Sequence, residues 1–124
     1  MHKKRAEKLI AALESGKYLK GKDALHRICK INSKGEVLAN EIDMPVKNCG
    51  KNTTHCCLGV AECIMPKSAR GEESIRTGLT NSERYTAIRK WLEINEGQMQ
   101  TLINKNDYSD TFEPIIVKLR EMMQ

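Results

Sequence analysis

The stretch "HCCLGVAEC", residues 55–63, holds three of the five cysteines in this chain, and its role decides how the fold is interpreted. Its central residues Leu58, Val60 and Ala61 are apolar. Apolar surroundings raise the pKa of a thiol and leave it unreactive, and cysteine is among the residue types most often buried. Gly59 has no side chain, so a neighbouring backbone could approach it closely. We therefore interpret the stretch as close-packed core.

A structural zinc site is one alternative for these cysteines. Zinc takes about four converging ligands, usually from paired Cys or His knuckles with short spacings. The potential ligands in or near the stretch are Cys49, His55, Cys56, Cys57 and Cys63. They contain no second knuckle, and the further candidates His26 and Cys29 fall on a different predicted element. The spacing therefore disfavours a metal site, and we predict no metal and no bound cofactor.

A nucleophilic thiol, with His55 as its base, is a second alternative. It would need a stabilised thiolate, which the apolar neighbourhood does not favour. The sequence also holds no phosphate-binding Gly-rich loop, no G-x-S-x-G, no H-E-x-x-H and no paired-carboxylate arrangement. Missing motifs do not exclude an enzyme, but a protein without catalytic activity is favoured.

Length and composition fit a single domain over residues 1–124, because domains cluster near about 100 to 150 residues. No apolar run approaches the roughly 20 residues that span a bilayer, and the basic N-terminus is not followed by the apolar stretch of a signal peptide. We therefore expect a cytoplasmic protein without a membrane partner. In a reducing compartment, an odd number of cysteines predicts free thiols.

The chain carries a net charge of +5, and the excess lies near the N-terminus. Residues 1–34 hold ten Lys or Arg against three Asp or Glu, whereas residues 72–124 hold seven against nine. Such asymmetry favours an anionic partner: nucleic acid, a phosphorylated small molecule or an acidic protein surface. A solvated helix face is the alternative explanation of the same charge.

Six residues are the candidate binding residues: Lys20, Lys22, Arg27, His55, Asn106 and Asp107. Two lysines around Gly21 suit an anionic ligand, since a glycine permits close approach of the backbone and the flanking cations supply charge. Arg27 would add a third cation, and His55 lies at the end of a polar loop. Asn106 and Asp107 precede a predicted helix, where they could donate and accept hydrogen bonds to a ligand or hold the loop in place.

The residue pattern predicts an α+β fold. Apolar residues recur at helical spacing over 3–14, and Ser15-Gly16 ends that helix. A β-hairpin is predicted from strands at 25–31 and 36–42 with a turn between them. A loop is expected over 43–54 and a surface connection over 66–78. We expect a short antiparallel sheet, the hairpin plus a further strand, packed against the N-terminal helix and a C-terminal group of helices.

The C-terminal half is predicted to be helical. Thr80 and Glu83 match a capping box, a short helix contains Met99, and Asp110 or Thr111 could cap a final helix. Three successive helices over 82–122 resemble a helix-turn-helix DNA reader, whose base contacts would be Gln98, Gln100, Thr101 and Asn104. That half is net negative, which opposes phosphate binding. A nucleic-acid-binding regulator is thus the alternative function, and a helical subdomain that covers the hairpin is the favoured interpretation.

Four segments resemble a family of small uncharacterised proteins from tailed bacteriophages and prophages. They are "ALESGKYLKGKDALHR" at 12–27, "CCLGV" at 56–60, "WLEI" at 91–94 and "LINKNDYSDTFEPIIVKL" at 102–119. The family pattern has Leu-Asn-Asp where this chain has Lys105-Asn106-Asp107, and it offers no template for residues 28–54.

The resemblance implies a phage protein that acts in the cytoplasm of the infected bacterial host cell. Small proteins of this kind commonly counter host defence, as anti-CRISPR proteins do, by binding a nucleotide signal or by occluding a host defence protein complex. We therefore expect a non-enzymatic anti-defence inhibitor, with an anionic nucleotide or a host complex as its partner. The sequence does not fix the oligomeric state, and a homo-oligomer is one alternative.

Overall fold

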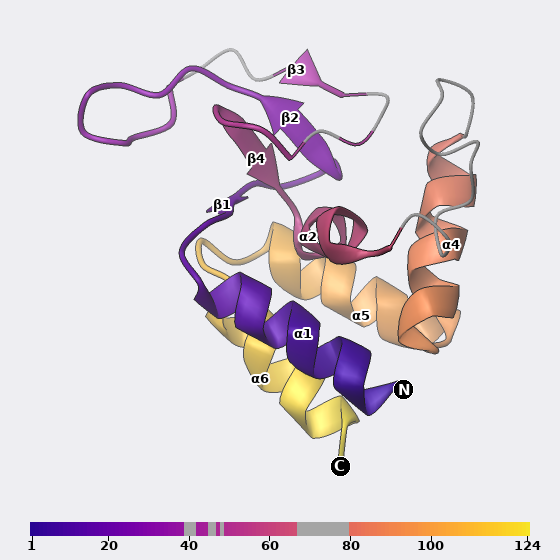
Figure 1. Cartoon of the computed structure of the whole chain (residues 1–124). Coiled ribbons are helices and arrows are strands. Elements are labelled where there is room, and N and C mark those ends of the chain that lie inside the picture. Colours follow the sequence, from indigo (N-terminus) through magenta and orange to yellow (C-terminus); the bar gives the residue numbers. More distant parts are fainter. Residues whose placement is uncertain (39–41, 45–46, 48, 67–79) are drawn as a thin grey trace.

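The computed structural model describes residues 1–38, 42–44, 47, 49–66 and 80–124 (Figure 1). The helices are α1 (Lys3–Glu14), α2 (Cys57–Ile64), α4 (Asn81–Leu92), α5 (Glu96–Asp107) and α6 (Glu113–Met122). The strands are β1 (Leu19–Lys20), β2 (His26–Ile28), β3 (Ile42–Asp43) and β4 (Thr53–His55). The predicted α+β class is confirmed. Most of the predicted connection at 66–78 lies outside the described residues, as does part of the predicted loop at 43–54.

The sheet has the strand order β1-β4-β2-β3 and is mixed. Strand β2 pairs antiparallel with both β3 and β4, but β1 pairs parallel with β4, with Leu19 opposite Thr54. The prediction of a wholly antiparallel sheet is therefore wrong at this edge. Because β4 inserts between β1 and β2, which run in opposite directions, it can be antiparallel to only one of them.

The predicted hairpin is present in a shorter form. Strands β2 and β3 pair through Arg27 with Asp43 and Ile28 with Ile42. Closer to the turn, an isolated bridge joins Ile31 to Val37. In the turn, the Asn32 side chain accepts hydrogen bonds from the backbone N–H groups of Lys34 and Glu36, both at 2.9 Å. The loop expected over 43–54 overlaps the strands at both ends. Its first residue, Asp43, belongs to β3, and its last two residues, Thr53 and Thr54, belong to β4.

Helix α1 confirms the predicted amphipathic segment. Its apolar stripe, Ala6, Leu9, Ile10 and Leu13, is buried. Gly16 follows with φ of 73°, the left-handed conformation that glycine adopts at little cost.

Capping boxes begin two of the C-terminal helices. The predicted box of Thr80 and Glu83 opens α4, and a second one, between Asn95 and Gln98, opens α5. The N-cap residue of α6 is Phe112, whose side chain makes no cap hydrogen bond, so the predicted N-cap position at Asp110 or Thr111 is wrong by one or two residues. The Thr111 hydroxyl nevertheless accepts a hydrogen bond from the N–H of Glu113, the first residue of α6, at 3.4 Å. Pro114 in the first turn explains why a cap matters less here, since proline has no N–H to satisfy.

Helix α2 lies at the centre of the molecule, between the sheet and helices α1 and α5 (Figure 1). Cys57, Leu58, Val60 and Ala61 are almost completely buried. A Cβ atom on Gly59 would overlap the carbonyl group of Leu25, so the backbone before β2 lies directly against this glycine. The interpretation as close-packed core is confirmed for residues 55–62, whereas Cys63 is only half-buried.

Candidate functional site

Three of the candidate cations line one pocket, which we call the basic pocket. It has a volume of about 320 Å³ and is lined by Lys20, Gly21, Lys22, Asp23, Arg27, Ser109 and Asp110. The lysines come from β1 and the turn after it, and the arginine comes from β2. The fold thus gathers the positive charge that the sequence placed on two separate segments.

Each cation of the basic pocket also contacts a protein oxygen. Lys20 Nζ donates to the backbone carbonyl of Asn106 at 2.6 Å, and Lys22 Nζ lies 3.5 Å from Asp110 Oδ1. Arg27 Nε donates to Asp43 Oδ1 at 2.5 Å. Burial, followed by the charge of Lys22, lowers the pKa of Lys20. Both aspartates are largely exposed, with side-chain exposures of 98% for Asp110 and 67% for Asp43. Exposed ion pairs contribute little, so a stronger anion could replace either aspartate.

Asn106 supports the basic pocket from behind and is completely buried. Its side-chain Nδ2 donates to the carbonyl of Gly21 at 3.0 Å, and its Oδ1 accepts from the N–H of Cys57 at 3.0 Å. Asp107 Oδ1 accepts from the backbone N–H of Asp23 at 3.1 Å. Both side chains hold the segment that carries the lysines. Of the two roles that the sequence left open, ligand binding or loop fixing, these contacts are those of loop fixing.

We expect the substitution Asn106→Ala to lower the unfolding free energy by about 2 to 4 kcal/mol, because it leaves the Gly21 carbonyl and the Cys57 N–H without partners in the interior. Urea denaturation of the two proteins measures this difference. Asn104→Ala, at an exposed site on the same helix, is the control and should change stability by less than about 0.5 kcal/mol. Equal stabilities for the two variants would contradict the assigned role of Asn106.

His55 does not reach the basic pocket. The sequence placed it at the end of a polar loop, but it is the last residue of β4 and only 2% exposed. Its Nδ1 lies 2.8 Å from Nδ1 of His26, which is its pairing partner on the neighbouring strand β2. Strand β4 carries His55 into the interior and away from Lys20, Lys22 and Arg27, and its role as a binding residue stays a prediction.

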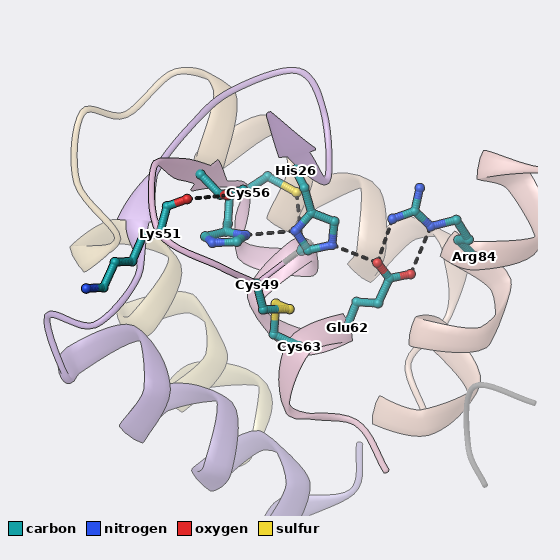
Figure 2. Close-up of a disulfide and its surroundings, with 10 residues drawn as sticks. His26, Cys49, Lys51, Cys56, Glu62, Cys63 and Arg84 are labelled. Atoms are coloured by element: carbon teal, nitrogen blue, oxygen red, sulfur yellow. Dashed lines mark hydrogen bonds and ion pairs between the residues drawn. A yellow bond between two sulfur atoms is a disulfide. The ribbon is translucent and has the colours of Figure 1, made fainter. Parts of the chain in front are cut away.

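His26 and His55 begin a row of buried polar side chains that continues to Glu62 and Arg84. Figure 2 shows the His26 ring pointing toward Glu62, and Arg84 reaching the same carboxylate from α4. His26 Nε2 lies 2.7 Å from Glu62 Oε1, while Arg84 donates to Oε1 at 2.6 Å and to Oε2 at 2.9 Å. All four residues are 4% exposed or less.

The environment shifts the pKa of two members of this row. Burial, with a smaller effect from His26, lowers the pKa of His55 to about 4. Burial alone would raise the pKa of Glu62, but hydrogen bonds from Arg84 and His26 outweigh it and lower the pKa to about 2. At neutral pH, His55 is therefore uncharged and Glu62 is a carboxylate, which Arg84 neutralises.

Cys49 and Cys63 form a disulfide next to the histidine pair, with 5.9 Å between their Cα atoms. The prediction of free thiols is therefore wrong for these two cysteines. The reason is that β4 leads straight into α2, which returns Cys63 to the segment that precedes β4. Cys29, Cys56 and Cys57 lie outside this disulfide and are buried.

The adjacent thiols of the core do not form a nucleophilic site. Burial raises the pKa of Cys56 to about 11 and that of Cys57 well above its ordinary value. Cys56 instead caps α2, where its sulfur accepts from the N–H of Gly59 at 3.4 Å. Thiols that stay protonated at neutral pH lack the thiolate that attacks a substrate.

Sequence reasoning missed Glu62 and Arg84 as members of a site, and it set His26 aside as a metal ligand because His26 falls on a different predicted element. Glu62 offered a signal, because a carboxylate within an otherwise apolar run needs a buried partner. No comparable signal identified Arg84, which lies 22 positions away and meets Glu62 only in the folded chain.

The side chains proposed as DNA base contacts on α5 are mostly engaged within that helix. Gln98 accepts from the N–H of Asn95 at 3.0 Å, Gln100 donates to Asn104 at 3.0 Å, and Thr101 donates to the carbonyl of Gly97 at 2.9 Å. These bonds give no support to a nucleic-acid-reading surface, and this alternative stays an untested prediction.

Comparisons with protein-family models, curated proteins and solved structures found no match to this chain. Within the described residues, no helix combines the length and apolar character needed to cross a membrane. The fold and the site define an α+β domain with a basic pocket on one side of its sheet and a buried row of histidine, glutamate and arginine beneath it.

Proposed function

We propose that this chain is a non-enzymatic binding protein whose basic pocket holds a small phosphorylated anion of the nucleotide class. The observation that carries this proposal is the convergence of Lys20, Lys22 and Arg27 on one pocket of about 320 Å³. Phosphate groups carry several acceptor oxygens, which lysine and arginine side chains bind through charge-assisted hydrogen bonds.

The backbone around Gly21, between the two lysines, is held in place by the protein itself. Its N–H donates to the His55 carbonyl at 2.7 Å and its carbonyl accepts from Asn106, so both of its polar groups are already fixed. A Cβ atom here would lie 2.7 Å from Thr54 Oγ1, which explains the glycine between the two lysines. The segment is thus held rigidly, and a rigid segment binds with less loss of conformational entropy.

The resemblance to phage proteins supports a role for this binding in the host cell. An inhibitor of host defence could sequester a nucleotide signal in the basic pocket or place the pocket against an acidic surface of a defence complex. We propose the first mode, because a concave pocket fits a small molecule better than a protein surface.

The double variant Lys20→Ala/Lys22→Ala is expected to weaken nucleotide binding at least about tenfold, since two charge-assisted contacts to phosphate are lost. Isothermal titration calorimetry with a panel of linear and cyclic nucleotides measures the affinity. The matched control, Lys3→Ala/Lys4→Ala, removes the same charge from exposed positions of α1 and should bind as the unchanged protein does.

Circular dichroism checks that the double variant is folded, because Lys20 also bonds to Asn106. If the panel yields no ligand, or if the folded double variant binds as tightly as the control, the proposal is wrong. A phage plaque assay on a defended host then tests the host role separately from the ligand.

A further inference from the structure

Four side chains with metal-binding atoms converge beneath β2 and β4. One ligand atom from each of His26, His55 and Cys63 lies within 4.8 Å of the other two. Cys49 is bonded to Cys63 and so brings a second sulfur to the same place. This convergence lies apart from the basic pocket, because His26 and Arg27 are consecutive in β2 and consecutive strand residues point to opposite faces.

The set of two histidines and two cysteines matches the donors of a structural zinc site. Zinc binds Cys sulfur at about 2.3 Å and His nitrogen at about 2.0 to 2.1 Å in tetrahedral geometry. Two nitrogen ligands then lie roughly 3.3 Å apart. The two Nδ1 atoms are 2.8 Å apart, so they would separate by about half an ångström to bind one ion. The two sulfurs, which are bonded to each other in the oxidised protein, would separate to roughly 3.8 Å.

The groups around His26 hold it in the orientation that a metal ligand needs. Its Nε2 lies 2.7 Å from Glu62 Oε1 and can donate to that carboxylate, while its Nδ1 is the ring nitrogen that faces His55. Metal-bound histidines commonly donate their second ring N–H to a carboxylate in this manner. Arg84 fixes the carboxylate through two hydrogen bonds (Figure 2).

A pocket of about 450 Å³ opens beside this cluster and gives access to it. Its lining includes Cys49 and His55 together with Lys17, Lys51 and Asn52. An ion or a small thiol in this pocket could therefore contact Cys49 of the disulfide and His55, whereas His26 lies behind them and is fully buried.

We propose that His26, Cys49, His55 and Cys63 bind one Zn²⁺ ion when the disulfide between the two cysteines is reduced. Two molecules of a low-molecular-weight thiol supply the two electrons and two protons that convert the disulfide to two thiols, and they leave as their own disulfide. Zinc then binds both sulfurs as thiolates and releases two protons. The two states use the same side chains, so the oxidised protein has the disulfide and the reduced protein has the zinc.

The ion would be structural, because four protein ligands leave no open position for a substrate. The ion would join four parts of the chain: β2, the segment before β4, the end of β4, and α2. The disulfide joins only two of them, the segment before β4 and α2. Zinc is expected in preference to magnesium or calcium, since thiolate and imidazole ligands suit the softer ion.

The test uses the full chain, reduced with a thiol under argon and then supplied with Zn²⁺ or Co²⁺. We expect native mass spectrometry to show one zinc per chain and a rise in the melting temperature on the order of 10 °C. With Co²⁺, the visible spectrum should show the intense bands of a tetrahedral site and a sulfur-to-metal charge-transfer band. Zinc should protect two cysteines from alkylation, and mass mapping should identify them as Cys49 and Cys63.

Variants separate the site from the other thiols. Cys63→Ser and His55→Gln should each reduce zinc retention after desalting at least tenfold, whereas Cys57→Ala, which removes a core thiol, should retain one equivalent. Should either ligand variant fail to fold, the alkylation pattern of the unchanged protein decides alone. Reduced protein that binds no stoichiometric zinc, a disulfide that resists the thiol in the native state, or protection of other cysteines overturns the proposal.

Discussion

Gly59→Ala is expected to lower the unfolding free energy by more than about 4 kcal/mol, which is a large part of the stability of a domain of this size. The added Cβ atom would overlap the backbone carbonyl of Leu25, and backbone atoms cannot move aside by a change of rotamer. Helix α2 would have to move away from the segment before β2 and open the core on both sides. Chemical denaturation of the purified variants measures the loss.

Gly97→Ala is the matched control, because this glycine also lies in a helix, α5. A Cβ atom there would meet only the side-chain Oδ1 of Asn95 at 3.3 Å. Alanine is the better helix former by about 1 kcal/mol. The control should therefore be as stable as the unchanged protein or up to about 1 kcal/mol more stable. Equal losses for the two variants would show that α2 does not depend on close approach at Gly59.

Arg84→Met is expected to cost about 3 to 5 kcal/mol, since it leaves the buried Glu62 carboxylate without its cation. Hydrogen bonding from His26 alone does not replace the two bonds that Arg84 makes. Lys90→Met, at an exposed position of the same helix, is the control and should change stability by less than about 0.5 kcal/mol.

The double variant Glu62→Gln/Arg84→Met tests the reason for this loss. Glutamine keeps an oxygen that accepts from His26 but has no charge to bury, so it should restore more than half of the stability lost in Arg84→Met. If the double variant is no more stable than the single one, an uncompensated carboxylate is not the cause. Thermal denaturation of the three proteins at one pH gives the comparison.

Local signals in the sequence predicted the helices well. The stripe that begins at Ala6 and the capping box at Thr80 each depend on residues three or four positions apart, and both are present in the structure. The burial of residues 55–63 was also predicted, because a run of small and apolar residues has few other uses. The sequence likewise identified the cations Lys20 and Lys22, which the structure places in one pocket.

The sheet and the buried row depend on contacts between distant residues, and these could not be predicted. Strand β1 has two residues, too few to show an alternation of polar and apolar side chains. His26 meets His55 across 29 positions, and Cys49 meets Cys63 only after β4 and α2 have formed. Ligand spacing along the chain therefore does not bear on the zinc site proposed above, whose residues come from four separate segments.

The bonds from Asn106 to the lysine segment bear on when the proposed anion binding could arise during protein synthesis. Lys20 and Gly21 meet Asn106 across 86 and 85 positions of the chain. Contacts over such distances form late, because a long loop must close before they do. A nascent chain that has emerged only as far as α2 already has every cation of the basic pocket but not the residue that sets their positions. Affinity for the anion should therefore appear only after α5 leaves the ribosome. The onset of this affinity would report that α5 has packed against the lysine segment.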